Sequence, residues 1–355
     1  MQGSFLVIEV MSWAAIRGQE AAREQVLRYW RSGRWGHAYA LTGPAGIGKR
    51  LFARELAKGL MCERRAAELA ACDRCPSCLQ VLAETHPDVH VVRTPEGKHS
   101  LPVEQMREFC AALWRKPLRG GWVVGIVEDA EEMNAESANA FLKTLEEPPA
   151  GVVILLVASS WERLLPTIRS RCQQVSLRPL GREDVAAILT EHGVEDEAVR
   201  EAALRWCRGS ASRALAIARG GLWELREELL SRLFQGQVEV EGWVKRCLEY
   251  AEGAGKESAA QRERAELVLD VLLEGLREGL RWGVIGGSGS SPEEQRQQTL
   301  GLRFGVEQIL DWQERTLQAY EHLDRRVPLP LVFESLFEHY AQACSGLKVQ
   351  TTPAG

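Results

Sequence analysis

Four of the nine cysteines in this chain lie close together, and their spacing is typical of a metal site. They follow the pattern C-x9-C-x2-C-x2-C, formed by Cys62, Cys72, Cys75 and Cys78. Two-residue gaps let successive thiolates converge on one tetrahedral ion, and Pro76 favours a turn between them. Four sulfur ligands favour Zn²⁺ and leave no open coordination position, so we expect a structural site. A redox pair, an iron–sulfur centre and a chance cluster are the alternatives.

A second group of residues with chemical potential is the glycine-rich stretch GPAGIGKR at residues 43–50. It matches the phosphate-loop pattern G-x-x-x-x-G-K, with Gly43, Gly48 and Lys49 at the defining positions and Gly46 between them. The glycines let backbone N–H groups turn toward a phosphate, and Lys49 adds a positive charge. The sequence therefore predicts a site for ATP or ADP. A glycine-rich turn with a chance lysine is the alternative.

The last position of this motif departs from the pattern. Arg50 stands where a Ser or Thr hydroxyl normally binds Mg²⁺. A guanidinium cannot bind Mg²⁺ and repels it, so we expect Arg50 to contact phosphate oxygens or to point into solvent. We therefore expect nucleotide to be bound weakly or without hydrolysis.

An acid pair, Glu128 and Asp129, follows a strongly apolar stretch of the sequence. A phosphate-loop ATPase needs carboxylates at such a strand end, one for Mg²⁺ and one to orient water. The usual order is Asp then Glu, and here it is reversed. We expect the pair to lie beside the phosphate loop. Two solvated acids at a strand end are the alternative interpretation.

These residues lie within an alternation of strands and helices. Apolar strands are predicted at residues 37–43, 88–93, 122–129, 151–160 and 172–179, and helices at residues 18–32, 49–62, 102–117 and 135–149. Strands that are apolar throughout and alternate with helices predict a parallel sheet covered on both faces. We therefore expect an α/β domain with a five-stranded parallel sheet, in which the cysteine cluster is an insertion.

The strand signals fade after Pro179. Short helices are predicted over residues 181–220, and a longer helical region runs from Trp223 to the end. The stretch GGSGSSPE at residues 286–293 predicts a flexible loop within that region. A chain of 355 residues exceeds one typical core, which agrees with a division into two or three domains.

Composition restricts the kind of protein further. A net charge of -5 argues against a free-standing nucleic-acid binder, which usually carries a basic excess. The N-terminus lacks the basic start and cleavage site of a signal peptide, and no run of 18 apolar residues predicts a membrane helix. An odd number of cysteines without the spacing of a disulfide scaffold favours a reducing compartment. The expectation is a cytoplasmic protein without membrane association.

Three stretches of the sequence resemble one known family. They are GHAYALTGPAGIGK, EDAEEMNAESANAFLKTLEEPP and LLPTIRSRCQQV, the last of which contains Ser170-Arg171-Cys172. Together they resemble the AAA+ subunits of the bacterial replicative clamp loader of DNA polymerase III, over residues of about 15–220. Within that family the altered phosphate loop is most similar to the delta-prime branch, because the tau/gamma motor subunits keep Ser or Thr after the loop lysine.

The resemblance implies roles for several further residues. Arg171 would be an arginine finger that reaches the ATP site of a neighbouring subunit, with Arg169 as the nearby alternative. Ser159 and Ser160 end the fourth strand, where a polar sensor is expected. Arg213 matches the lid arginine, and an exposed helix charge is its alternative. The four clustered cysteines would form a structural zinc module.

The resemblance also implies a domain organisation. A P-loop (AAA+) domain would occupy residues 1–180, with the zinc module at 62–78. A small helical lid domain would follow at 181–222. An all-α C-terminal collar domain for oligomerisation would occupy 223–355.

The function implied by the resemblance is that of a delta-prime-like scaffold subunit with little or no ATPase of its own. It would assemble with tau/gamma and delta, and the complex would open the sliding clamp and load it on primer-template DNA. A tau/gamma-like motor subunit that hydrolyses ATP is the alternative. A zinc-dependent nucleic-acid binder that acts alone is a third hypothesis, and the acidic net charge argues against it.

Overall fold

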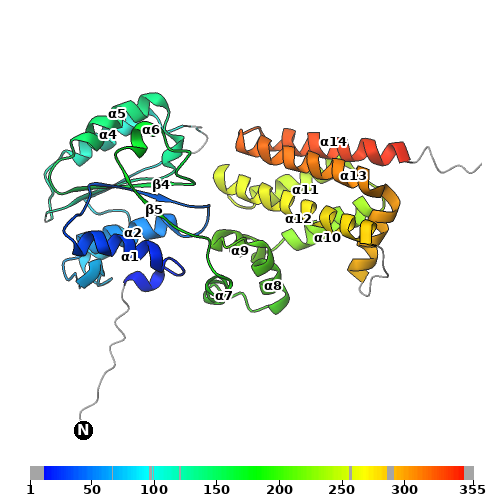
Figure 1. Cartoon of the computed structure of the whole chain (residues 1–355), viewed down its shortest axis with the longest axis horizontal. Helices are drawn as coiled ribbons and strands as arrows, with labels where there is room; N and C mark the ends of the chain where they lie inside the picture. Colours follow the sequence, from blue (N-terminus) through cyan, green and yellow to red (C-terminus); the bar gives the residue numbers. More distant parts are fainter. Residues whose placement is uncertain are drawn as a thin grey trace, which may run out of the picture. The chain divides into compact units, whose positions relative to one another are not determined.

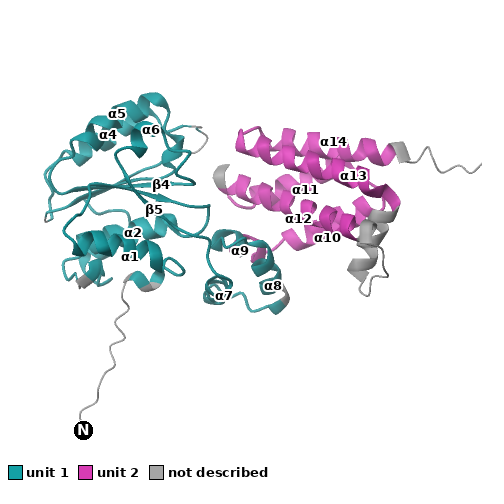
Figure 2. Ribbon diagram, viewed as in Figure 1, with its two compact units in different colours: residues 1–214 teal, residues 215–355 magenta. Residues whose placement is uncertain are grey.

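The structure is a computed structural model of the chain, and it describes residues 12–347 except 66, 96, 97, 99, 120, 256, 257 and 286–291. The chain forms two compact units, Met1–Ala214 and Leu215–Gly355 (Figure 2). Most of the loop predicted at 286–293 lies outside the described residues. The division into three domains at residues 180 and 222 stays a prediction.

A five-stranded parallel sheet organises the first unit (Figure 1). Its strands are β1 (Ala38–Thr42), β2 (Val89–Val92), β3 (Val123–Val127), β4 (Val152–Ala158) and β5 (Gln173–Ser176). The order across the sheet is β2-β3-β4-β1-β5, and every pairing is parallel. The predicted sheet is therefore confirmed, and each strand lies inside its predicted range. Because parallel strands share one carboxyl edge, the segments that follow β1 and β3 come out on the same side.

Helices cover both faces of this sheet (Figure 1). One face carries α1 (Glu20–Arg31) and α2 (Lys49–Met61), and the other carries α4 (Val103–Leu113), α5 (Ala135–Glu146) and the short α6 (Pro166–Arg169). Strand β4 shows why its sequence is apolar throughout. Val153 and Leu155 pack in the core that includes α1 and α2, whereas Ile154 and Leu156 pack in the core of α4 and α5. All seven residues of β4 are buried.

The cysteine segment lies between α2 and β2. It contains a 3-10 turn, η2 (Ala67–Leu69), and the helix α3 (Pro76–Leu82). Cys75 is the N-cap residue of α3 and Pro76 is its first residue, a position that suits proline because its missing N–H is not needed there. The sequence did not predict α3, which has only seven residues.

Three short helices end the first unit and lead into the second. They are α7 (Arg182–Glu191), α8 (Glu197–Trp206) and α9 (Ala211–Ala218), and each falls inside the helical region that the sequence predicts. Helix α9 crosses the boundary between the two compact units.

The second unit is helical, as the sequence predicts. It consists of α10 (Leu222–Phe234), α11 (Val240–Glu252), α12 (Ser258–Ile285), α13 (Pro292–Asp324) and α14 (Leu329–Leu347). Buried aromatic rings hold its core. The ring centroids of Trp243 and Phe337 are 5.2 Å apart, and those of Trp312 and Tyr340 are 5.3 Å apart. None of the helices in the described part of the chain combines the length and the apolarity needed to cross a bilayer.

Candidate nucleotide site and metal centre

The phosphate loop connects β1 to α2, as the sequence predicts. Gly48 is the N-cap of α2 and supplies no side chain to the first N–H groups of the helix. The first N–H groups of a helix can bind an anion. Lys49 contacts the loop itself, because its Nζ donates to the carbonyl oxygens of Gly43 and Pro44, each at 2.6 Å. These residues are placed where they could hold a phosphate group.

The loop also contacts the start of α9. The carbonyl oxygen of Gly46 accepts a hydrogen bond from the backbone N–H of Ala211 at 2.9 Å. Gly46 has a φ of +72°, and a Cβ atom there would lie 2.1 Å from Ser210 Oγ and 2.0 Å from Ser212 Oγ. Only glycine fits this approach. This contact joins segments that are far apart in the chain, and no local sequence pattern predicts it.

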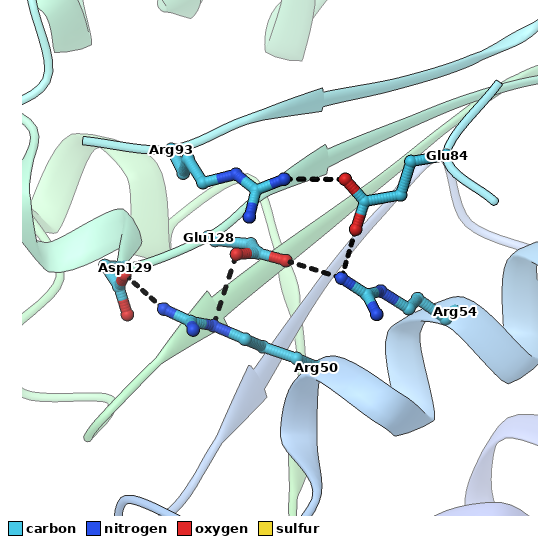
Figure 3. A network of polar contacts seen from close by, with 6 residues as sticks. All are labelled: Arg50, Arg54, Glu84, Arg93, Glu128 and Asp129. Atoms are coloured by element: carbon cyan, nitrogen blue, oxygen red, sulfur yellow. Dashed lines mark hydrogen bonds and ion pairs between the residues drawn. The ribbon is translucent and has the colours of Figure 1, made fainter. Parts of the chain in front are cut away.

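Arg50 pairs with the two acids that follow β3 (Figure 3). Arg50 Nε lies 3.2 Å from Glu128 Oε2, and its Nη2 lies 2.6 Å from Asp129 Oδ2. The prediction that the acids lie beside the phosphate loop is confirmed. The expectation for Arg50 was wrong, since it contacts its own chain's carboxylates. The reason is electrostatic: Glu128 is only 2% exposed, and a buried carboxylate needs a cation.

The ion pairs extend beyond Arg50 into a network of three arginines and three acids (Figure 3). Arg54 Nη2 lies 3.9 Å from Glu128 Oε1 and also pairs with Glu84. Arg93 Nη2 lies 2.6 Å from the other oxygen of Glu84. The roles of Arg54, Glu84 and Arg93 were not predicted from the sequence. Only the four-residue spacing of Arg50 and Arg54, which places both on one face of α2, could have pointed to part of the network.

This arrangement has a direct chemical consequence. A guanidinium lies against both carboxylates, where a phosphate-loop ATPase would hold Mg²⁺. Mg²⁺ requires close oxygen ligands in octahedral geometry, and it cannot share them with a positive side chain. The loop could bind phosphate through its N–H groups and Lys49. Because Arg50 pairs with both carboxylates, they are not placed to bind a Mg²⁺ ion that would activate the phosphoryl group.

The expected sensor residues, Ser159 and Ser160, directly follow β4, and the expected lid residue, Arg213, lies in α9. The backbone N–H of Ser159 donates to Glu131 Oε1 at 2.9 Å, and its Oγ is buried without a hydrogen-bond partner among the described residues. Ser160 Oγ accepts from the backbone N–H of Arg163 at 3.3 Å. Arg213 lies in the first turn of α9 and is 8% exposed, so the alternative of an exposed helix charge is wrong.

Arg171 is separate from this site. It follows α6, and its Nη1 donates to the carbonyl oxygen of Thr167 at 2.8 Å and to Ser170 Oγ at 3.0 Å. Its Nη2 pairs with Glu146 at the end of α5. These contacts lie on the face of the sheet opposite α2. The structure therefore does not bring Arg171 to the chain's own phosphate loop. Arg169 is the last residue of α6.

The four clustered cysteines converge, as the sequence predicts. The sulfur atoms of Cys62, Cys72, Cys75 and Cys78 all lie within 4.8 Å of one another. Tetrahedral zinc with bonds of about 2.3 Å requires sulfur atoms about 3.8 Å apart, so the cluster needs only a small contraction. Three of the four residues are buried, and none forms a disulfide. The donor set therefore fits a zinc ion.

Backbone N–H groups point at these sulfur atoms. The N–H of Cys72 donates to Cys62 Sγ at 3.3 Å, and that of Cys78 donates to Cys75 Sγ at 3.4 Å. Burial raises the pKa of Cys72, but the N–H groups of Arg74 and Cys75 outweigh it and lower the pKa to about 7. Burial raises the pKa of Cys62. N–H donors stabilise thiolates, which are the form that binds metal.

The other five cysteines have no such surroundings. Four are buried and Cys172 is partly exposed; the full set is Cys110, Cys172, Cys207, Cys247 and Cys344. Burial raises the pKa of Cys172 to about 12, so its thiol is neutral.

Known proteins that are similar to this chain match it mainly in the region that contains the phosphate loop and the cysteine cluster. Residues 18–181 match a family model described as DNA polymerase III, delta subunit. The chain is 46% identical over 138 residues to DNA polymerase III subunit delta' of Pseudomonas aeruginosa, which covers 39% of this chain and 42% of that protein. It is 34% identical over 210 residues to the Escherichia coli K12 delta' subunit, covering 59% and 63%. Over these residues the chain is similar in sequence to DNA polymerase III delta' subunits.

Other relatives with lower identity are named as gamma/tau subunits of DNA polymerase III. The gamma/tau subunit of Mycobacterium tuberculosis H37Rv is 31% identical over 211 residues, covering 58% of this chain and 36% of that protein. A gamma subunit-related protein of Thermotoga maritima has a solved structure with 19% identity and a TM-score of 0.43, covering 91% of this chain and 99% of that one. The similarity to delta' subunits is one of sequence. The chain spans about half the length of the delta' subunits it matches.

Proposed function

We propose that this chain is a delta-prime-like scaffold subunit of a bacterial clamp loader within the DNA polymerase III holoenzyme. It would assemble with tau/gamma and delta subunits in the cytoplasm. The complex would open the sliding clamp and load it on primed DNA. The family match over residues 18–181 and the delta' relatives support this proposal.

The contact between Arg50 and the acid pair supports the non-motor role. Glu128 and Asp129 would bind Mg²⁺ and orient water in a motor subunit, and here both lie against a guanidinium. Gly43, Gly46, Gly48 and Lys49 would then hold ATP or ADP weakly, without hydrolysis, and Arg213 would contribute from the lid. Such a subunit stabilises an assembly rather than driving it.

Arg171 would act on a neighbouring subunit. It lies on the opposite face of the sheet from α2, and its side chain is 32% exposed. A planar guanidinium stabilises the charge that develops on a transferred phosphoryl group. Arg171 would have to exchange its ion pair with Glu146 for a contact with ATP in the partner. Because Glu146 is itself half exposed, this exchange costs little.

The zinc ion would have a structural role. Cys62, Cys72, Cys75 and Cys78 would fill its coordination, so no position remains for a substrate. The core of the segment consists of these cysteines and Ala71. Such a core is too small to fold alone, so the metal would supply the folding free energy.

The helical parts would serve assembly. Residues 181–222 would form a lid beside the phosphate loop, and residues 223–355 would form the collar that joins the subunits. The helical second unit, with its own aromatic core, is consistent with a separate oligomerisation domain.

ATP hydrolysis by the isolated chain tests the proposal against its rival. The rival is a tau/gamma-like motor subunit, which the gamma/tau relatives at 31% identity make worth testing. We expect no hydrolysis above the buffer rate, with or without Mg²⁺. We also expect the chain to restore clamp loading when it is added to tau/gamma and delta. Robust turnover by the chain alone would instead identify a motor subunit.

A further inference from the structure

Lys58 is a buried cation in the last turn of α2, beside the cysteine cluster. Its side chain is 8% exposed, and its Nζ lies 2.6 Å from Asp73 Oδ1 and 2.7 Å from Glu55 Oε1. A buried ammonium is tolerated only where it is paired and hydrogen-bonded. Glu55 lies one turn earlier on the same helix, whereas Asp73 lies in the turn between Cys72 and Cys75. Lys58 therefore ties the phosphate-loop helix to the cysteine turn.

Asp73 adopts a backbone conformation that requires support. Its φ is +54°, in the left-handed region that residues other than glycine rarely adopt. This conformation directs the N–H of Asp73 toward the thiol of Cys78, and those of Arg74 and Cys75 toward the thiol of Cys72. One turn thus supplies N–H groups to two of the four sulfur ligands. The ion pair with Lys58 fixes the side chain of the residue on which that turn depends.

The backbone of α2 packs directly against the cysteine segment at the next residue. A Cβ atom at Gly59 would lie 2.1 Å from the carbonyl oxygen of Leu69. This close approach holds the end of the helix at a fixed distance from the segment. Lys58 therefore acts from a rigid position, and a short, directed ion pair can orient the turn.

We propose that Lys58 is the positioning residue of the zinc centre. Its ion pair with Asp73 holds the Cys72–Cys75 turn in the metal-binding conformation, so that little ordering is required when zinc binds. This inference depends on the zinc centre proposed above. Residues that orient metal ligands from behind typically change metal affinity about 10-fold to 100-fold when they are removed.

The test is the rate at which the full-length, zinc-loaded chain releases zinc to an excess of a chromophoric chelator. Lys58→Met keeps the apolar stem and removes the charge. Asp73→Asn keeps the size of the side chain and tolerates the left-handed conformation. We expect each variant to release zinc about 10-fold faster than the wild type, or more. The double variant should be no faster than the faster single one, because both changes remove the same contact.

Arg64→Met is the matched control. Arg64 is exposed and lies two residues after Cys62, so its loss changes the charge near the metal without touching the turn. Its release rate should equal that of the wild type. Wild-type rates for Lys58→Met and Asp73→Asn would overturn the proposal, and so would an equal acceleration in Arg64→Met. If Lys58→Met does not fold, Asp73→Asn decides, because it leaves Lys58 paired with Glu55.

Elemental analysis of the wild type separates the two levels of the inference. One zinc ion per chain together with unchanged release in the variants would refute only the role of Lys58. Less than one zinc ion per chain, in protein purified without chelator, would refute the centre and with it the role of Lys58.

Discussion

At the residue scale, the guanidinium of Arg50 lies against the two carboxylates that would hold Mg²⁺ in a phosphate-loop ATPase. The guanidinium forms an ion pair with Glu128 and donates a hydrogen bond to Asp129. It brings one positive charge where Mg²⁺ would bring two, and it has no open coordination position. The candidate site keeps the backbone of a phosphate loop while losing the part that activates a phosphoryl group.

Arg50→Thr places a hydroxyl at the position where the phosphate-loop motif normally has one. It should show how much the ion pairs of Arg50 stabilise the chain and how much they weaken the binding of Mg²⁺ and ATP. Without Mg²⁺ we expect the variant to be less stable by about 1–2 kcal/mol, because Glu128 loses its closest cation while Arg50 itself is half exposed. With Mg²⁺ the variant should bind ATP more tightly than the wild type. Urea unfolding and calorimetric titration, each with and without Mg²⁺, measure the two effects.

Arg50→Lys is the control for this prediction, since it keeps the charge and adds no metal ligand. It should gain no Mg²⁺-dependent affinity for ATP. Equal behaviour of the Thr and Lys variants would show that the hydroxyl does not create a magnesium site in this loop.

At the element scale, strands were easier to predict than the contacts they organise. Strands β3 and β4 are buried at every position, so their sequences are apolar throughout and their ranges could be predicted. Helices α3 and α6 have seven and four residues, too few to display a helical period. The cysteine site was predictable because all its ligands are close in sequence.

The ion network and the contact of α9 could not be predicted in the same way. Arg54, Glu84 and Arg93 come from three separate segments, and charged residues are common on any surface. The hydrogen bond from Ala211 to Gly46 joins the start of α9 to the phosphate loop, 165 residues earlier in the chain. Such contacts depend on the tertiary fold and leave no periodic pattern in the sequence.

Two glycines of the phosphate loop, Gly46 and Gly48, allow backbone strain to be measured separately from the steric contact with α9. Both have positive φ, +72° at Gly46 and +96° at Gly48, but only a Cβ at Gly46 would meet other atoms. We expect Gly48→Ala to destabilise the chain by about 1–2 kcal/mol, from backbone strain alone. Gly46→Ala should cost about 1–3 kcal/mol more, because Ser210 and Ser212 must move.

Chemical denaturation of both variants, followed by far-ultraviolet circular dichroism, measures this difference. Ser212→Ala in the Gly46→Ala background serves as the control, since removing one hydroxyl should recover part of the added cost. Equal stability of the two glycine variants would mean that α9 does not press on the loop in solution.

At the scale of the whole molecule, the proposed function divides the work between two sites on the first unit. The phosphate loop and its ion network contribute to stability, whereas Arg171 on the other face would act on a neighbour. An arginine finger acts in trans, so its removal should be silent in the isolated chain and visible only in the complex.

Arg171→Ala should lower the ATPase rate of a reconstituted clamp loader. Folding, zinc content and assembly should stay near those of the wild type, because a partly exposed ion pair contributes little stability. A finger is worth about 10³-fold to 10⁵-fold at its own site, but the bulk rate should fall much less, since other sites keep their own fingers. Steady-state ATPase and clamp-loading rates at matched assembly measure the effect.

Two further variants identify the residue responsible. Arg171→Lys should fail to restore activity, because an ammonium lacks the planar fork of a guanidinium. Arg169→Ala should behave as the wild type. A loss of activity in Arg169→Ala alone would transfer the finger role to that residue.

The ion pairs of Arg50 with Glu128 and Asp129 also have an evolutionary consequence. A change of this one codon to a hydroxyl residue would leave the buried carboxylate of Glu128 without its nearest cation. Selection against a less stable protein would oppose this change. The fold itself would thus favour keeping Arg50, and the proposed scaffold subunit would keep this altered loop even without selection on its role.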